Sequence, residues 1–128
     1  FVGECSADIV DELYATSSLF VLPSYYEGYG MVLTEALARG LPVISTTGGA
    51  IPYTVPDDVG ILVAPGDDVA LAGAIRDVLS DSPAGTSCRT RRENLASASR
   101  RYASCLPDWD EATDTFSGAV LALVRQMK

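Results

Sequence analysis

Two glutamates with seven residues between them, Glu27 and Glu35, are the side chains whose type and spacing best fit chemistry on a bound ligand. Glu27 lies beside the glycines Gly28 and Gly30, and Glu35 follows in a helix-forming run. An ionised carboxylate accepts hydrogen bonds through two oxygens, so Glu35 can hold both hydroxyls of a ribose and Glu27 can bind the hydroxyls of a sugar. Neither carboxylate is expected against a phosphate, because like charges repel.

The segment around both glutamates runs strand, loop, helix, turn and strand. Leu19–Leu22 is a continuous apolar run stopped by Pro23, which is typical of a strand buried on both faces of a parallel sheet. Met31–Arg39 is predicted as a helix closed by Gly40, and Val43–Ser45 as the next buried strand. At the carboxyl end of such a strand, loop amides and the positive end of the following helix point to one place, which suits a diphosphate.

Strands and helices alternate along the chain, which predicts an α/β fold, a Rossmann-like three-layer sandwich around a parallel β-sheet. About three full strands are recognisable, fewer than a doubly wound domain has, so we expect an incomplete sheet. We interpret residues 1–128 as one partial domain whose residues 104–128 form the C-terminal helix. The other expected elements are a strand end at Phe1–Gly3, a strand at Gly60–Val63, helices at Ala7–Ala15, Val69–Leu79, Cys88–Ala103 and Trp109–Met127, a helical or extended piece at Ile51–Val55, a turn at Thr46–Gly49 and a linker at Ser80–Ser87.

Local signals add detail to these elements. Asp67 is placed to cap the Val69–Leu79 helix, whose apolar residues, Leu79 included, fall on one face. For the adjacent aromatic residues Tyr25 and Tyr26, alternation predicts that one lines a ligand pocket and the other packs inward.

Composition and charge limit the class of partner. The chain has 128 residues, 48% of them hydrophobic and 20% charged, which indicates a soluble globular domain. The net charge is −8, and residues 1–75 hold ten acidic side chains against Arg39 alone. Nucleic-acid binding needs clustered basic residues, so we expect no nucleic-acid partner. No apolar run reaches the roughly 18 residues that span a bilayer, so we expect no transmembrane segment.

The sequence offers no His and only three Cys as ligands for a metal ion. The absence of His removes the commonest general base and metal ligand. Cys5, Cys88 and Cys105 are odd in number and far apart, so neither a disulfide framework nor a zinc site is indicated. We therefore expect no metal site, and reduced thiols in a cytoplasmic protein.

Arginines gather in one segment of the second half, at Arg89, Arg91, Arg92, Arg100 and Arg101. They could form an anion site or the solvated face of a helix. Because charge runs usually mark exposed surface, we favour the solvated face.

The run from Pro23 to Ile44 resembles the retaining, two-domain GT-B glycosyltransferases, the large family (glycosyl transferases group 1, family 4-like) of bacterial sucrose, glycogen and lipopolysaccharide glycosyltransferases. Their second domain carries proline-serine followed by two glutamates with seven residues between them. The resemblance covers nearly the whole chain and is densest over residues 13–67. The matching residues of the motif are Glu27, Gly28, Gly30, Glu35, Ala36, Gly40, Pro42 and Val43.

The resemblance implies that Glu27 contacts the donor sugar as a catalytic residue and that Glu35 holds the ribose. It also implies a reaction, the transfer of a hexosyl-type sugar from a nucleotide diphosphate sugar with retention at the anomeric carbon. No metal is obligatory, and no cofactor is implied beyond the donor substrate. The backbone groups that would receive the sugar and diphosphate belong to Gly28, Tyr29, Gly30, Met31 and Val32.

The sequence departs from the family pattern in what it lacks. In the family, an Arg and a Lys upstream of the position of Phe1 neutralise the diphosphate, and a separate N-terminal domain binds the acceptor. Here the chain opens on Phe1 without an initiating Met, so we expect a truncated segment that is inactive alone. Tyr53 stands where family members usually carry a Glu. A tyrosine there could stack on or hydrogen-bond a ligand, or pack on the sheet edge, and we favour packing.

Further expectations concern location and partners. The full-length protein is expected in the cytoplasm or at the membrane periphery, and uncovered strand edges favour a homodimer. The alternative to the enzyme is a non-catalytic nucleotide-sugar-binding or interaction module with the same fold. An unrelated α/β binding domain has less support, because no Gly-x-Gly-x-x-Gly opens a βαβ unit. The donor base and sugar, and the acceptor, are not set by these residues.

Overall fold

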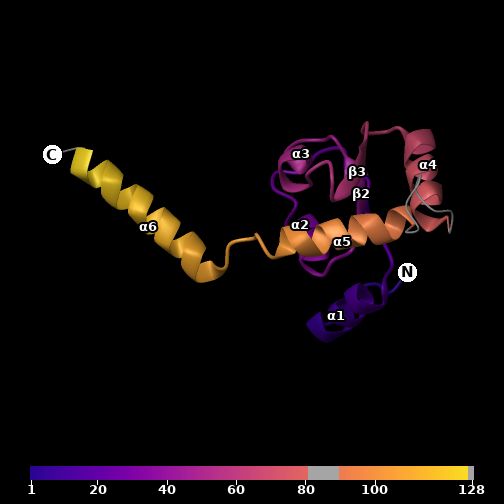
Figure 1. The fold of residues 1–128 in the computed structure, drawn as a ribbon, viewed down its shortest axis with the longest axis horizontal. Helices are drawn as coiled ribbons and strands as arrows, with labels where there is room; N and C mark the ends of the chain where they lie inside the picture. Colours follow the sequence, from indigo (N-terminus) through magenta and orange to yellow (C-terminus); the bar gives the residue numbers. More distant parts are fainter. Residues whose placement is uncertain (81–89, 127–128) are drawn as a thin grey trace.

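The computed structural model describes residues 1–80 and 90–126 (Figure 1). The expected linker at Ser80–Ser87 and the expected helix start at Cys88 therefore fall largely outside the described residues. Strands and helices alternate as the sequence predicts, and the piece at Ile51–Val55 is a short helix. The elements in chain order are α1 (Ala7–Thr16), β1 (Phe20–Leu22), α2 (Met31–Ala38), β2 (Val43–Thr46), α3 (Ile51–Thr54), β3 (Gly60–Val63), α4 (Asp68–Leu79), α5 (Arg91–Ala103) and α6 (Trp109–Gln126).

The three strands of the described residues form one parallel sheet in the order β1-β2-β3. Val21 pairs with Ile44, and Ile44 pairs with Ile61, which sets the register across the sheet. This confirms the predicted parallel α/β fold. The strand end expected at Phe1–Gly3 is wrong, because these residues are exposed and no described strand lies beside them to complete a ladder.

The core lies on the two faces of β2, every residue of which is buried. Val43 faces α2 and α5, where it packs with Leu33 and Leu37, and Ile44 faces α4, where it packs with Val78. Successive strand residues point to opposite faces, so β2 serves both layers. Burying each such aliphatic side chain contributes roughly 1.5 to 3 kcal/mol. The first strand, predicted as buried on both faces, is only half-buried because β1 lies at the edge of the sheet.

The helix ends follow the predicted capping residues. Gly40 follows α2 with a φ of 72°, a left-handed conformation that glycine adopts without strain. The Asp67 carboxylate accepts a hydrogen bond of 2.8 Å from the Ala70 amide at the start of α4, as expected. Leu79, expected on the buried face of α4, is instead 53% exposed, because it is the last residue of the helix.

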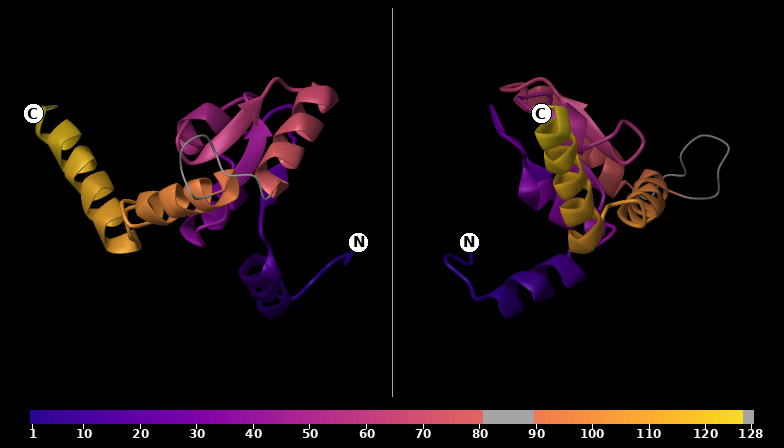
Figure 2. Two further views of the ribbon diagram at one scale, coloured as in Figure 1. Left: turned by 45° about the vertical axis from the view of Figure 1, so that its right-hand side comes forward. Right: turned by 90° about the vertical axis from the view of Figure 1, so that its left-hand side faces the viewer.

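Helix α6 lies away from the sheet in the two views of Figure 2, whereas α1 reaches the edge strand β1 through Tyr14, whose ring stacks on that of Phe20. Neither helix has a buried residue. α6 carries exposed apolar side chains along its length, among them Trp109 and Phe116. None of the helices in the described residues is both long and apolar enough to cross a membrane.

Candidate functional site

Glu27 lies in the loop that leaves the carboxyl end of β1, and its position is set by three neighbours. The Ser24 hydroxyl donates a hydrogen bond of 2.7 Å to Glu27 Oε1. The Ala50 amide donates one of 2.8 Å to the Glu27 carbonyl, and Gly49 pairs with Glu27 as an isolated parallel bridge. The carboxylate is therefore oriented by Ser24 of its own loop, and the backbone of Glu27 is held by the turn that follows β2.

The turn Gly48–Gly49 follows β2 and lies directly against this loop. A Cβ at Gly49 would lie 2.2 Å from the Glu27 carbonyl oxygen, and one at Gly48 would lie 2.3 Å from the Tyr25 carbonyl oxygen. Gly49 also has a φ of 63°. Sequence reasoning identified these glycines only as a turn, although two adjacent glycines after a strand are a signal of close backbone approach.

The N-terminus of α2 lies beside Glu27. Gly30, the residue before the helix, has a φ of 75°, and a Cβ there would lie 3.8 Å from Glu27 Cβ. The Thr54 hydroxyl of α3 holds the loop by donating a hydrogen bond of 2.8 Å to the Tyr29 carbonyl. Within the described residues, the amides of Met31 and Val32 have no assigned acceptor. Such amides, with the positive end of the helix dipole, suit an anion.

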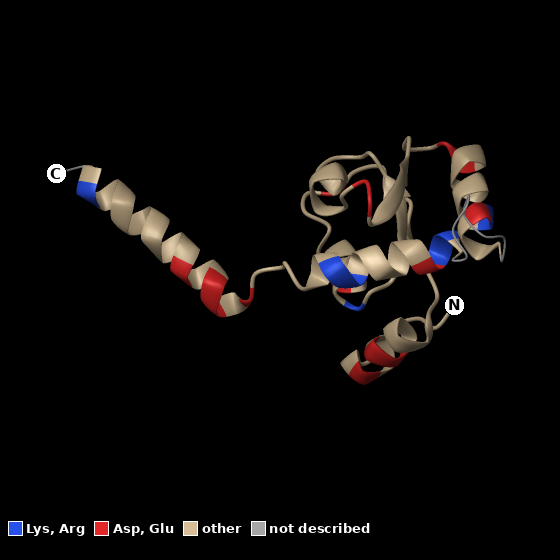
Figure 3. Ribbon diagram, in the orientation of Figure 1, with Lys and Arg blue, Asp and Glu red and all other residues tan. Residues whose placement is uncertain are grey.

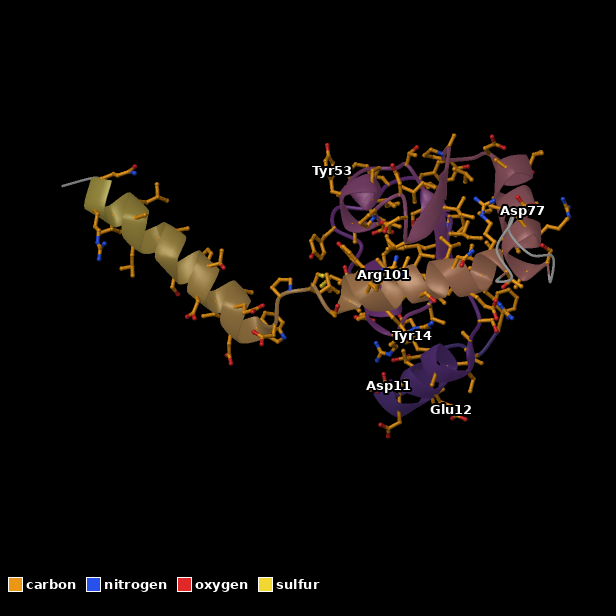
Figure 4. All side chains as sticks on the ribbon, viewed as in Figure 1. Asp11, Glu12, Tyr14, Tyr53, Asp77 and Arg101 are labelled. Atoms are coloured by element: carbon orange, nitrogen blue, oxygen red, sulfur yellow. The ribbon has the colours of Figure 1, made fainter. Side chains whose placement is uncertain are left out.

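Glu35 lies in different surroundings, on the side of α2 that faces α1. The Tyr14 hydroxyl donates to Glu35 Oε2 at 3.2 Å, and Tyr14 extends from α1 toward the rest of the molecule in Figure 4. The Arg39 guanidinium lies 4.5 Å from the centre of the Tyr14 ring and forms an ion pair with Asp11. No hydrogen bond joins Glu27 to Glu35 in the described part of the chain.

Tyr14 has a raised pKa. Partial burial is the largest cause, and the negative charge of Glu35 and the hydrogen bond to it act in the same direction, while Arg39 opposes them. The neutral phenol is thereby kept as a donor to Glu35. Sequence reasoning did not identify Tyr14 as part of the site, because 20 residues separate it from Glu35 along the chain.

A small cavity of about 180 Å³ lies where the strands end. Pro23, Thr46 and Val63, which follow or end β1, β2 and β3, contribute to its wall. Tyr25 also lines it and rests on Gly66, 3.4 Å from where a Cβ would stand. A ligand at the carboxyl ends of the strands would have this cavity beside it.

The aromatic expectations for packing are wrong. Tyr25 and Tyr26 are 76% and 75% exposed, so neither packs inward, because both belong to a loop that has left the sheet. Tyr53 is 88% exposed on α3 and points away from the molecule in Figure 4, so it does not pack on the sheet edge.

Charge is unevenly distributed in the described residues. Basic side chains lie on α5, in the last turns of α4 and α6, and at the end of α2, and Figure 3 shows the basic segments on these helices. The loop at Glu27 contributes a carboxylate and backbone amides, and no basic residue falls between Phe1 and Ala38. The described residues contain no group of three or more His, Cys, Asp or Glu side chains that could hold a metal ion.

The parallel sheet, the loop at its carboxyl edge and the helix beginning there define a Rossmann-like α/β domain of the GT-B type. The chain belongs to the family named Glycosyl transferases group 1, whose profile it matches over residues 1–101. It is 31% identical to sucrose-phosphate synthase from Thermosynechococcus elongatus, with a TM-score of 0.76 over 100% of this chain and 30% of that one.

Curated relatives agree with this family. The chain is 34% identical over 117 residues to sulfoquinovosyl transferase SQD2 of Arabidopsis thaliana, covering 88% of this chain and 21% of that protein. It is 36% identical over 120 residues to D-inositol 3-phosphate glycosyltransferase of Streptomyces avermitilis, which covers 90% of this chain and 24% of that protein. It is 33% identical over 126 residues to glycogen synthase of Mycobacterium tuberculosis, which covers 98% of this chain and 29% of that protein. The chain thus spans less than a third of the length of these relatives.

Proposed function

We propose that this chain forms the donor-binding part of a retaining glycosyltransferase, which transfers a hexosyl-type sugar from a nucleotide diphosphate sugar to an acceptor. The observation that carries the proposal is the loop at Glu27. Its carboxylate is oriented by Ser24, its backbone is held by the Gly48–Gly49 turn, and the amides at the start of α2 lie beside it. A chain of a glycosyltransferase family thus presents a carboxylate and an anion-binding helix end together.

The Glu27 side chain and the backbone that follows it have separate roles in this proposal. Glu27 accepts hydrogen bonds from hydroxyls of the donor sugar, next to the bond that breaks. The backbone of Gly28 to Val32 receives the sugar and the diphosphate. Because the departing phosphate gains negative charge in the transition state, preorganised amides there stabilise it more than they stabilise the bound donor.

Glu35 binds the ribose hydroxyls, and Tyr14 positions it. A carboxylate can accept one hydrogen bond from each of two hydroxyls while a third donor fixes its orientation. The Tyr14 hydroxyl, 3.2 Å from Glu35 Oε2, is that third donor. The other oxygen, Oε1, accepts no hydrogen bond within the described residues and is left for the ligand.

The proposal for the whole protein is that a separate N-terminal domain binds the acceptor. The amides of the loop supply only partial positive charge, so cations from outside this chain would neutralise the diphosphate, and the chain alone would be inactive. We further propose a reaction without a metal or other cofactor, and a cytoplasmic protein, at the membrane periphery in some settings.

The test separates the two glutamates in the full-length protein. Glu35→Ala should weaken the binding of the nucleoside diphosphate by about tenfold to a hundredfold, because hydrogen bonds to a charged group contribute roughly 1.5 to 3 kcal/mol. Glu27→Ala should leave this affinity nearly unchanged and lower kcat on the order of a hundredfold, since it misplaces the donor sugar. Calorimetry gives the affinity, and initial rates give kcat.

Glu12→Ala is the matched control, because Glu12 is an exposed glutamate of α1 without a side-chain hydrogen bond among the described residues (Figure 4). It should change neither quantity. Equal and negligible effects of all three substitutions would contradict the assignment. If the two glutamates behave as expected, a thermal-shift screen of the full-length protein with uridine, guanosine and adenosine diphosphates identifies the base of the donor.

A further inference from the structure

A second and larger cavity, about 500 Å³ in volume, lies at the opposite end of the sheet from the Glu27 loop. Its wall includes Ser18, just before β1, and Pro42, just before β2, so it lies at the amino ends of these strands. The ends of α1 and α2 and one side of α5 enclose it. Its volume falls within the range of about 300 to 1,000 Å³ that is usual for small-ligand sites.

The cavity is basic in an otherwise acidic chain. Arg39, Arg92 and Arg100 line it, which is three of the chain's nine basic residues, although the net charge is −8. Arg39 already pairs with Asp11, so Arg92 and Arg100 are the arginines that face a ligand without an acidic partner among the described residues. Glu93 is the single acidic side chain that the described residues contribute to the wall. Its Oε2 accepts a hydrogen bond of 2.8 Å from the Thr90 amide in the capping box of α5, so one oxygen of this carboxylate is satisfied by the backbone.

The guanidinium groups retain donors for a ligand. Arg92 makes no hydrogen bond or ion pair within the described part of the chain. Arg100 Nη2 donates to the Ser97 hydroxyl at a long 3.4 Å. An arginine carries five N–H donors, so most of those on Arg92 and Arg100 are left without a protein acceptor.

The side chain of Arg100 lies over Gly40, which follows α2. A Cβ at Gly40 would lie 2.5 Å from Arg100 Cγ, so the absence of a side chain at Gly40 gives the arginine stem its place. The solvated face predicted for the arginines agrees with the exposure of Arg91, Arg100 and Arg101, while Arg92 is half-buried and Arg89 lies outside the described residues. Arg91 pairs with Asp77 at 3.6 Å, and the wall of the cavity includes Arg92 and the exposed Arg100.

We propose that this cavity binds a small phosphorylated ligand, through bidentate hydrogen bonds from Arg92 and Arg100 to the phosphate oxygens. Arginine matches phosphate geometry in this way, and the Ser18 hydroxyl in the wall supplies a further polar contact for the rest of the ligand. The site is separate from the Glu27 loop and does not depend on the function proposed for that loop, although Tyr14, which contacts Glu35, is one of its lining residues.

Calorimetry of the full chain with inorganic phosphate at low salt tests the proposal, because screening weakens exposed charge pairs at higher salt. Arg92→Ala and Arg100→Ala should each weaken phosphate binding about tenfold or more, and the double variant should abolish it. Arg101→Ala removes the same charge from the same helix outside the cavity and should change the affinity less than twofold.

Three results would overturn the proposal: no phosphate binding by the intact chain, equal losses in Arg101→Ala and Arg92→Ala, or full binding by the double variant. The last result would place the phosphate at the donor loop. Circular dichroism of each variant shows whether it is folded, and Arg100→Lys, which keeps the charge and the stem, should retain part of the affinity.

The phosphate group can belong to a free metabolite or to a lipid headgroup. Co-sedimentation with phosphatidic acid vesicles, against phosphatidylcholine vesicles, distinguishes the two sources. Binding to inorganic phosphate without co-sedimentation assigns the site to free phosphorylated ligands. Arginine-dependent co-sedimentation with phosphatidic acid supports the same phosphate site with a lipid as its source.

Discussion

At the scale of single residues, the site depends on positions where only a small side chain or one hydroxyl fits. Gly49 has no room for a Cβ, and Ser24 and Tyr14 each direct one carboxylate. Two glutamates that are equivalent in the sequence thus acquire different surroundings. Glu27 is half-buried beside the start of α2, and Glu35 is exposed beside α1.

The first residue-scale prediction concerns Gly49. Gly49→Ala should destabilise the protein by about 2 to 4 kcal/mol, because it forces a left-handed conformation on alanine and places a methyl group 2.2 Å from the Glu27 carbonyl oxygen. Urea denaturation measures this change. Gly73→Ala is the control: its Cβ meets nothing within 4 Å inside α4, so it should stabilise by about 0.5 to 1 kcal/mol. Equal effects would show that the Gly49 turn is free to move.

The second concerns the ionisation of Tyr14. Because its pKa is raised above the ordinary value of 10.0, the folded protein keeps the phenol proton at a pH where the unfolded chain releases it. This contribution to stability is complete below pH 10 and is lost as the pH rises through the higher folded pKa. The unfolding free energy should therefore fall between pH 9 and pH 11 by more in the natural sequence than in Tyr14→Phe.

Tyr53→Phe is the control for this pH experiment, since Tyr53 is 88% exposed and should leave the difference between pH 9 and pH 11 unchanged. At neutral pH, Tyr14→Phe should lower stability by only about 0.5 to 1 kcal/mol, because the hydrogen bond it removes is exposed. A pH dependence identical in Tyr14→Phe and the natural sequence would contradict the role of Tyr14.

At the scale of elements, three connections place the groups of the donor site at the carboxyl ends of the strands. β1 leads into the Glu27 loop, β2 leads into the Gly48–Gly49 turn, and α3 anchors the loop through Thr54. Because parallel strands end at the same edge, segments distant in the sequence meet there. The opposite edge receives the ends of α1 and α2, and α5 crosses beside them to complete the basic cavity.

At the scale of the whole molecule, both edge strands of the sheet are left without a neighbouring strand on their outer side among the described residues. β1 and β3 are the edge strands, and the residues of β1 are only half-buried. Open edges present unpaired N–H and C=O groups that can pair with another chain. α6 also presents exposed apolar side chains. Self-association could therefore use either the open sheet edges or α6.

We predict that the chain forms a dimer through a sheet edge. Size-exclusion chromatography with light scattering should show a dimer whose fraction rises with protein concentration. A chain ending at Leu106, without α6, should still form it, because no residue of α6 contributes to the core. A monomer at all concentrations would refute self-association, and a dimer lost with α6 would assign it to the helix.

The sequence was sufficient for most of the elements and for the family. Apolar runs predicted the strands that begin at Phe20, Val43 and Gly60, since a buried strand needs them, and Asp67 and Gly40 predicted two helix ends, since a capping side chain and a left-handed glycine act locally. The whole run from Pro23 to Ile44, with Glu27, Glu35 and their glycines, identified the family, because it combines a strand end, a loop and the helix that follows. These features depend on neighbours within a few residues.

The tertiary structure alone decided what surrounds these residues. Tyr14 reaches Glu35, Gly49 closes on Glu27 and Arg100 lies over Gly40, and each contact joins segments 20 or more residues apart. The exposure of Tyr25, Tyr26 and Tyr53 also differs from what local pattern predicted. Local pattern specifies which face of an element is apolar, but the burial and charge environment of a side chain depend on which other elements pack against it.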